Sequence, residues 1–132
     1  MTETGKEKKY SFKKEERLCS LKAIGELFAS GERFSSYPLF VVYKQVENKT
    51  KAPAVLFSVS KKRFKRAVDR NRIKRLMRES YRLNKPKFCE AVGENSRTLN
   101  IAFVYIENTL LEFGQIEAGI KRAMEKITKQ LG

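Results

Sequence analysis

The stretch from Lys61 to Arg82 constrains the fold most, because it is too highly charged to be buried and too regular in its pattern to be a loop. Its eleven Lys and Arg stand against two acids, Asp69 and Glu79, so it contributes +9 of the chain's formal charge of +14. At about 100° per residue, a helix gathers basic side chains on one side and apolar side chains on the other. The basic side holds Asn71, Lys74, Arg75, Arg78 and Arg82, and the other holds Ile73, Leu76, Met77, Ser80 and Leu83. We therefore expect a surface helix that packs on a core through its apolar side.

The cations of this helix are spaced so that they repel one another. Arg66, Arg70, Lys74, Arg78 and Arg82 follow at intervals of four residues and make four like-charge pairs. Such pairs oppose folding by very roughly 1–2 kcal/mol in total, whereas an ordinary solvated helix alternates its signs. Since the free protein gains nothing from this repulsion, we interpret the segment as a binding face for a polyanion. Its guanidinium groups favour the phosphates of a nucleic acid, and a membrane surface or an acidic protein is the alternative.

Length and composition indicate one soluble domain. A chain of 132 residues, of which 41% are apolar, can bury a single core. Residues 1–10 are polar and lack periodicity, which predicts a flexible basic arm ahead of one RNA-binding domain at residues 11–132. No apolar run is long enough to span a bilayer, and the cationic N-terminus lacks the apolar region of a signal peptide. We therefore expect a cytoplasmic protein that does not enter a membrane.

Residues that could carry catalysis are scarce. Histidine is absent, although metal-free RNA cleavage commonly uses imidazole as general acid and base. Asp69 is the single aspartate and is expected to cap or precede the basic helix, and the glutamates are too scattered to hold a divalent cation together. We expect a buried thiol at Cys19 near the first helix and a loop thiol at Cys89, both reduced. The protein alone is therefore predicted to have no catalytic residue and no metal site.

The first half of the chain predicts one helix followed by strands. Ser20 is a good N-cap, apolar residues recur behind it at helical spacing, and Gly31 is a typical C-terminal stop. These apolar residues are Leu21, Ile24, Leu27 and Phe28. Strands are then expected over 33–36, 39–43 and 54–59, with the last two paired as a hairpin.

The second half predicts a helix, a strand and a helix. The basic helix is expected to end at Asn84-Lys85-Pro86, and residues 87–98 are expected to form a loop. A strand is expected over 99–106, and Thr109 with Glu112 makes a capping box for a long helix. The apolar face of that helix comprises Phe113, Ile116, Ile120, Met124, Ile127 and Leu131. The order αβββαβα, with about four strands and three helices, predicts an α+β two-layer sandwich.

Two runs of residues resemble the signature of the bacterial ribonuclease P protein component. They are Ser58-Val59-Ser60-Lys61-Lys62 and Arg70-Asn71-Arg72-Ile73-Lys74-Arg75-Leu76-Met77-Arg78-Glu79. The similarity extends outward over roughly residues 12–130, and the placement of the second run on a helix after a strand end makes it specific. The resemblance implies a fold like the second domain of ribosomal protein S5, in which the basic helix joins two parallel strands by a left-handed crossover, against the usual rule.

The resemblance also implies a function. A noncatalytic protein subunit pairs with a large catalytic RNA, one protein per RNA, and together they act as an endoribonuclease that hydrolytically removes the 5′ leader of precursor tRNA. The required Mg²⁺ is held mainly by the RNA subunit, and no organic cofactor is implied. The residues expected to meet the catalytic RNA are Lys61, Lys62, Arg63, Lys65, Arg66, Arg70, Asn71, Arg72, Lys74, Arg75 and Arg78. The residues expected to line a cleft for the single-stranded leader, between the first helix and the sheet, are Ile24, Phe28, Val41 and Tyr43.

Two positions depart from the pattern of the family. Ile24 stands where many relatives have an aromatic ring, and Phe64 replaces a glycine that often follows the Lys-Lys pair. Since Phe does not adopt positive φ readily, Phe64 implies a different turn. Ordinary core packing stays open for Phe28 and Tyr43. For the function, a ribosomal or other structural RNA-binding protein, a helix-turn-helix DNA reader and a free-standing ribonuclease stay open as alternatives.

Overall fold

The computed structural model describes residues 16–46, 53–93 and 99–131 of the chain. Its elements, in chain order, are α2 (Leu21–Ser30), β1 (Glu32–Ser36), β2 (Leu39–Gln45), β3 (Ala54–Val59), α3 (Ala67–Val92), β4 (Leu99–Tyr105) and α4 (Phe113–Leu131). This order is the predicted αβββαβα, and its strands form a single mixed sheet, so the expected α+β fold class is confirmed. The arm expected over residues 1–10 lies outside the described residues.

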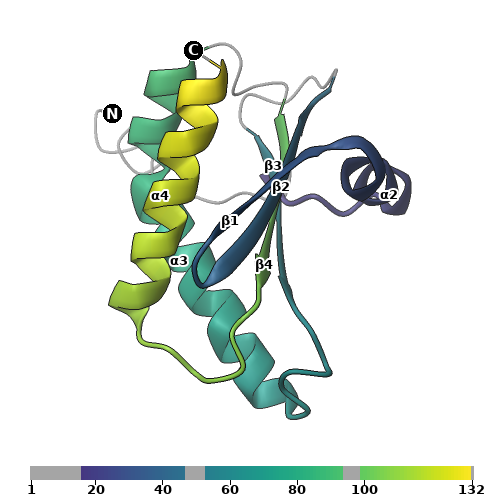
Figure 1. The fold of residues 1–132 in the computed structure, drawn as a ribbon, viewed down its shortest axis with the longest axis vertical. Coiled ribbons are helices and arrows are strands. Elements are labelled where there is room, and N and C mark those ends of the chain that lie inside the picture. The colour runs from purple at the N-terminus through teal and green to yellow at the C-terminus, as the bar shows by residue number, and fades with distance from the viewer. Residues whose placement is uncertain (1–15, 47–52, 94–98, 132) are drawn as a thin grey trace, which may run out of the picture.

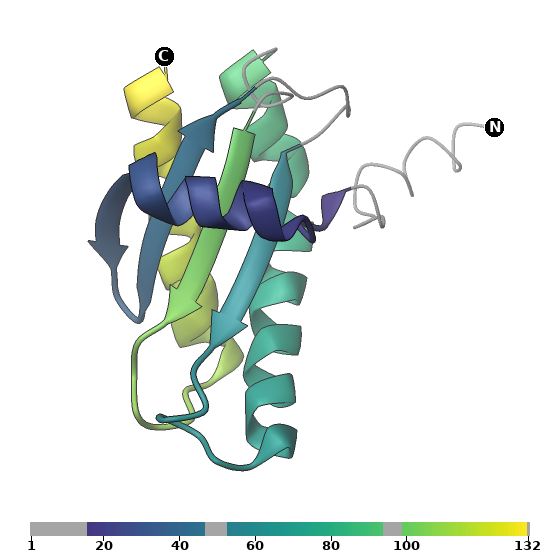
Figure 2. The ribbon, with the colours of Figure 1, turned by 90° about the vertical axis from the view of Figure 1, so that its right-hand side faces the viewer.

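Helices lie on both faces of the sheet. α3 and α4 lie side by side against one face (Figure 1), and α2 crosses the opposite face (Figure 2), which is called the α2 face below. The main core fills the space between the sheet and the α3–α4 pair. At its centre the rings of Phe57 and Phe103 stack at 5.6 Å between centroids, and Tyr81 of α3 meets both at about 6 Å. A smaller apolar cluster beneath α2 consists of Leu18, Leu27, Val42 and Ala102.

The strands pair in the order β1-β2-β4-β3. β1 and β2 form an antiparallel hairpin, β2 pairs antiparallel with β4, and β3 pairs parallel with β4. The hairpin predicted between 39–43 and 54–59 is therefore wrong, because β4 lies between those two strands. All residues of β4 except Val104 are buried, and a strand covered on both faces takes an interior position in a sheet.

β3, α3 and β4 form a parallel βαβ unit with a left-handed crossover. In Figure 2 both strands run downward, β3 lies to the right of β4, and α3 passes behind the sheet. Crossovers of this type are right-handed in nearly all proteins, so this handedness is a specific feature of the fold. It lays α3 along the β3 edge of the sheet and leaves one side of the helix facing solvent.

α3 continues through Asn84-Lys85-Pro86, so the predicted end of the basic helix is wrong, as is the loop predicted over 87–92. Packing carries the helix past the proline, because buried residues go on at helical spacing as Tyr81, Lys85, Phe88 and Val92. The Lys85 ammonium is held by the buried carboxylate of Glu16. Residues 94–98 of the predicted loop lie outside the described residues.

Gly93 ends α3 with a φ of 60° and donates its N–H to the carbonyl of Cys89, a conformation that glycine adopts readily. Cys89 thus lies on the helix and is half-buried, so the expected loop position is wrong; Cys19 lies near α2 as expected but is exposed, so its expected burial is wrong. Leu83, expected on the core side, is 41% exposed because the buried stripe passes through Tyr81 and Lys85 instead.

Helix starts were predicted with mixed success. Ser20 caps α2 as expected, with its Oγ accepting from the Ala23 N–H at 3.2 Å. Asp69 lies in the first turn of α3, where its negative charge interacts favourably with the helix dipole. It does not cap the helix, because Arg66 is the N-cap residue. The capping box predicted at Thr109 is wrong by one turn: the Glu112 N–H donates to Gln115 Oε1 at 3.1 Å directly before α4.

Candidate nucleic-acid interface

The eleven residues predicted to meet RNA lie together on the loop that leads into α3 and on the N-terminal half of that helix, and we call this surface the basic face. Eight of them are exposed, namely Lys61, Lys62, Arg63, Lys65, Arg66, Asn71, Arg72 and Arg75. Three are half-buried, namely Arg70, Lys74 and Arg78. The basic face therefore presents a dense array of cations on a rigid helix and one adjoining loop.

The loop of the basic face is folded on a short hydrogen-bonded turn. The Ser60 carbonyl accepts from the N–H groups of Arg63 and Phe64 at 3.2 Å each, and its Oγ accepts from the Lys62 N–H at 3.0 Å. Phe64 is buried, with its ring 5.9 Å from that of Tyr105 in the main core. No residue other than glycine has a positive φ in the described part of the chain. Phe64 thus fixes the loop by anchoring it in the core, in a turn that needs no glycine.

Arg70 braces this loop from the first turns of α3. Its Nη1 donates to the carbonyls of Phe64 and Lys65, at 2.8 and 2.9 Å. Carbonyls at this point would otherwise depend on water, because they lie ahead of the helix and outside its ladder of hydrogen bonds. Arg70 therefore shapes the surface on which its basic neighbours are presented.

Arg63 joins the loop to the segment between β4 and α4. Its Nη1 donates to Asn108 Oδ1 at 2.8 Å. The Asn108 N–H in turn donates to Glu107 Oε1 at 2.7 Å, and the Arg63 charge helps to lower the pKa of the Glu107 carboxyl, after the larger effects of its hydrogen bonds from Tyr37 and from the backbone N–H of Asn108. Two loops that are far apart in the sequence thus hold one another in place at this end of the sheet.

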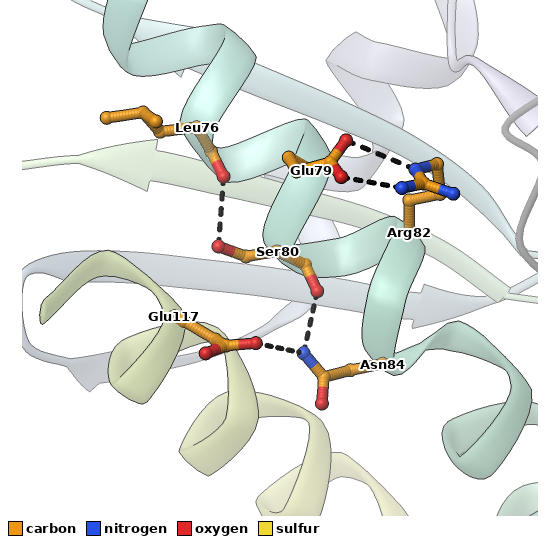
Figure 3. A network of polar contacts seen from close by, with 6 residues as sticks. All are labelled: Leu76, Glu79, Ser80, Arg82, Asn84 and Glu117. Atoms are coloured by element: carbon orange, nitrogen blue, oxygen red, sulfur yellow. Dashed lines mark hydrogen bonds and ion pairs between the residues drawn. The ribbon is translucent and has the colours of Figure 1, made fainter. Parts of the chain in front are cut away.

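A polar network marks where the basic face stops along α3 (Figure 3). Arg82 forms a bidentate ion pair with Glu79, with N–O distances of 3.1 and 2.6 Å. The hydrogen bond from Arg82 lowers the pKa of the Glu79 carboxyl. Asn84 donates to the Ser80 carbonyl at 2.7 Å and to Glu117 of α4 at 3.2 Å. Directly beyond Arg78, therefore, Glu79, Arg82 and Asn84 bind groups of α3 and α4 within the protein.

The four residues expected to line a leader cleft are not brought together. Ile24 and Phe28 are half-buried on α2, against the cluster on the α2 face. Val41 and Tyr43 are buried in the main core on the opposite face, and the Tyr43 hydroxyl binds Gln130 of α4. The expectation of one cleft lined by all four is wrong, because side chains alternate along a strand and these two have the phase that faces α3 and α4.

The residues of β2 that share a face with α2 are Phe40, Val42 and Lys44. Phe40 is half-buried against the same cluster as Ile24 and Phe28. Lys44 Nζ donates to Ser30 Oγ at the end of α2 at 2.8 Å, and Arg33 of β1 donates to the Phe28 carbonyl. Apolar and aromatic groups thus lie beside cations on the α2 face. The alternation of β2 could have identified this set once one residue of the strand had been assigned to α2.

The described residues contain neither a metal-binding cluster nor a membrane-spanning helix. Within residues 16–46, 53–93 and 99–131, no three side chains of His, Cys, Asp or Glu lie close enough together to hold a metal ion. Across the same ranges, none of the helices combines the length and the hydropathy that crossing a membrane requires.

Comparisons with known proteins supply relatives for this arrangement. Residues 12–128 match the family model described as Ribonuclease P. A ribonuclease P protein component from Porphyromonas gingivalis is 39% identical over 119 residues, which cover 89% of this chain and 87% of that protein. One from Chlorobium phaeobacteroides is 35% identical over 128 residues, with 89% and 88% covered. The solved RNase P protein of Staphylococcus aureus, 20% identical, matches the fold with a TM-score of 0.67 over 89% of this chain and 98% of that one.

Proposed function

This chain belongs to the family of ribonuclease P protein components, and from that premise we propose that it binds the catalytic RNA of ribonuclease P and the 5′ leader of precursor tRNA. It takes part in the ribonuclease P holoenzyme of tRNA processing. The basic face carries the proposal, because it concentrates cations on one rigid surface that the fold leaves open. We also propose that one copy of the protein binds each RNA and that the protein acts in the cytoplasm.

The basic face is suited to the backbone of a folded RNA. Its exposed guanidinium and ammonium groups, such as Lys62, Arg72 and Arg75, can each neutralise a phosphate and release condensed counterions. Contacts of this kind fix the position of a protein on an RNA without reading its sequence. The bracing of the loop by Arg70 and Phe64 holds the cations in a fixed pattern, so that less conformational entropy is lost on binding.

The α2 face is suited to a single strand. Phe28 and Phe40 are half-buried aromatic rings on that face, and bases stack on such rings with little dependence on sequence. Lys44 and Arg33 place positive charge beside them, where leader phosphates would run. We assign the leader to this surface, with Ile24, Phe28 and Phe40 as its apolar contacts, in place of the set that included Val41 and Tyr43.

The reaction itself is assigned to the RNA subunit. Mg²⁺ held by that RNA would supply a hydroxide nucleophile and stabilise the leaving oxygen. The residues of this chain act by electrostatics: the basic face offsets repulsion between two RNAs, and the α2 face orients the leader. The absence of histidine from the sequence agrees with this division, since no imidazole can act as general acid or base.

Crosslinking tests the choice of partner. A photoreactive group attached after Arg72→Cys or Arg75→Cys substitution, in a background in which Cys19 and Cys89 are replaced by serine, is expected to crosslink ribonuclease P RNA from a cell extract. The same group at Lys129, an exposed position on α4, serves as the matched control. Recovery of ribosomal RNA, in place of ribonuclease P RNA, would support the structural RNA-binding alternative and contradict the proposal.

A further inference from the structure

The turn between β1 and β2 presents an aromatic ring that neither the basic face nor the apolar cluster explains. Tyr37 is 56% exposed, and it is the one aromatic residue among the large exposed hydrophobic side chains of the described chain. A ring left open in this way contributes little burial to the stability of the fold. Burial in the core therefore does not explain why an aromatic residue stands at this position.

The turn that carries Tyr37 is tightly fixed. Arg122 of α4 donates to the Tyr37 carbonyl at 2.6 Å, and the Ile106 N–H donates to the Pro38 carbonyl at 3.0 Å. Ser36 Oγ donates to the Gly119 carbonyl at 2.8 Å. A Cβ on Gly119 would lie only 2.7 Å from the Tyr37 carbonyl oxygen, so the helix and the turn are in close contact. The backbone at Tyr37 is thus anchored from two elements.

The side chain of Tyr37 is fixed as well. Its hydroxyl donates to Glu107 Oε2, and Glu107 Oε1 accepts from the N–H of Asn108. Asn108 in turn accepts from Arg63 of the basic face. A chain of hydrogen bonds therefore runs from the exposed ring to the basic face. An exposed ring with both ends held can stack on a ligand with little loss of conformational entropy.

Tyr37 lies in the turn directly before β2. Phe40, on the α2 face, is three residues further along the chain, and three residues span at most about 10 Å. Arg63 and Arg122 provide positive charge near the ring, and the Arg63 charge partly offsets the single negative charge of Glu107. Aromatic, cationic and open, this position has the features of a stacking platform for an unpaired base.

We propose that Tyr37 stacks on one unpaired base of the precursor leader, beyond the bases that lie on the α2 face, and so extends the leader-binding surface to the end of the sheet. This inference rests on the proposed function. It goes further by naming a residue, a contact type and a leader-length dependence. Short leaders that do not pass Phe40 gain nothing from Tyr37, and longer leaders gain the stacking contact.

The test measures affinity of the reconstituted holoenzyme for precursor tRNAs whose leaders increase one nucleotide at a time. Tyr37→Ala is expected to weaken binding by about 5- to 30-fold for long leaders, in the lower part of the range for loss of one base–aromatic contact, and to leave short leaders unchanged. Tyr37→Phe, which keeps the ring and loses the bond to Glu107, is expected to bind almost as wild type. Thermal unfolding of each variant checks that the fold is retained.

Each contrary outcome has a distinct meaning. An equal loss for every leader length with Tyr37→Ala would place the ring against the RNA subunit and overturn the assignment to the leader. No loss at any length would overturn the stacking proposal, and a loss with Tyr37→Phe equal to that of Tyr37→Ala would show that only the hydroxyl bond matters. If the wild-type holoenzyme failed to bind or cleave any precursor, the proposed function itself would fail.

A spectroscopic readout separates stacking from indirect effects. The chain contains no tryptophan, so Tyr37→Trp introduces a single reporter at the platform. Its fluorescence is expected to be quenched when a long-leader precursor binds and to stay constant with a short-leader precursor. Constant fluorescence with both precursors, at concentrations where binding is complete, would contradict the proposal.

Discussion

At the scale of single residues, Arg70 differs from its basic neighbours because its guanidinium already has two partners within the protein. Arg70→Ala is expected to lower the free energy of unfolding by about 1–2 kcal/mol, since the Phe64 and Lys65 carbonyls lose a charged donor. Arg72→Ala, at an exposed position on the same helix, is expected to change it by less than about 0.5 kcal/mol. Urea unfolding of the two variants measures both values, and equal stabilities would contradict the bracing role.

Tyr81 gives the protein a dependence on alkaline pH. Burial in the main core raises the pKa of its phenol well above the ordinary value of 10.0. The folded state thus holds the proton more tightly than the unfolded state, so stability is full below pH 10.0 and falls as the pH rises above that value. Tyr81→Phe is expected to make this fall shallower, as measured by urea unfolding at neutral and alkaline pH. A fall of the same steepness in Tyr81→Phe would assign the effect to other groups.

Residue types predicted which side chains are exposed better than they predicted which groups those side chains contact. Lys61, Arg72 and Arg75 were predicted at the surface because clustered cations are not buried without counter-charges. Val41 and Tyr43 were placed on the wrong face, because the run predicted as a strand, residues 39–43, is apolar on both faces and so does not reveal which face is which. The bracing by Arg70 depends on the path of a loop, which no pattern of residue types reveals.

At the scale of elements, the contact between α4 and the β1–β2 turn depends on the absence of a side chain. Gly119→Ala is expected to destabilise the protein by about 1–3 kcal/mol, because its Cβ would lie 2.7 Å from the Tyr37 carbonyl oxygen and 2.8 Å from the Pro38 ring. Gly114→Ala is the matched control on the same helix: nothing lies within 4 Å of its Cβ, and it is expected to stabilise by about 0.5–1 kcal/mol. Thermal unfolding compares the two variants, and a neutral Gly119→Ala would disprove the close contact.

Helical segments were predicted by their periodicity, but their ends and the strand pairing were not. The apolar face predicted for α4 is confirmed, with Ile116, Ile120 and Ile127 fully buried. A long amphipathic pattern fits only one orientation of the helix against the core. α3 extends beyond its predicted end because the packing of Phe88 and Val92 in the core outweighs the destabilising effect of Pro86 on the helix. The pairing of β3 with β4 in place of β2 is a long-range outcome of covering the most apolar strand on both sides, and local composition does not contain it.

At the scale of the whole molecule, the fold places the basic face and the α2 face on different sides of the sheet. The left-handed crossover sets α3 along the β3 edge, so the basic face opens to one side, while α2 covers part of the other face of the sheet. The Arg63–Asn108 contact and the anchored β1–β2 turn lie at the same end of the sheet, where β3 and β4 finish (Figure 2). Under the proposed function, this separation would let one protein hold the RNA subunit and guide the leader at the same time.

The central claim is that the position of the charge, and not its amount, determines binding to the catalytic RNA. The double variant Arg72→Glu, Arg75→Glu and the double variant Lys121→Glu, Lys129→Glu both lower the formal charge from +14 to +10, since each reversal removes two units. All four positions are exposed, the first two on the basic face and the last two on α4. The two double variants therefore differ in the position of the charge change and not in its size.

The deciding measurement is the affinity of each variant for ribonuclease P RNA as a function of salt concentration. The basic-face variant is expected to bind more weakly and to reduce the slope of log affinity against log salt by about one to two units, whereas the α4 variant keeps a slope close to that of the wild type. Equal losses of affinity and slope in the two variants would show that the RNA responds only to net charge, and would contradict the account.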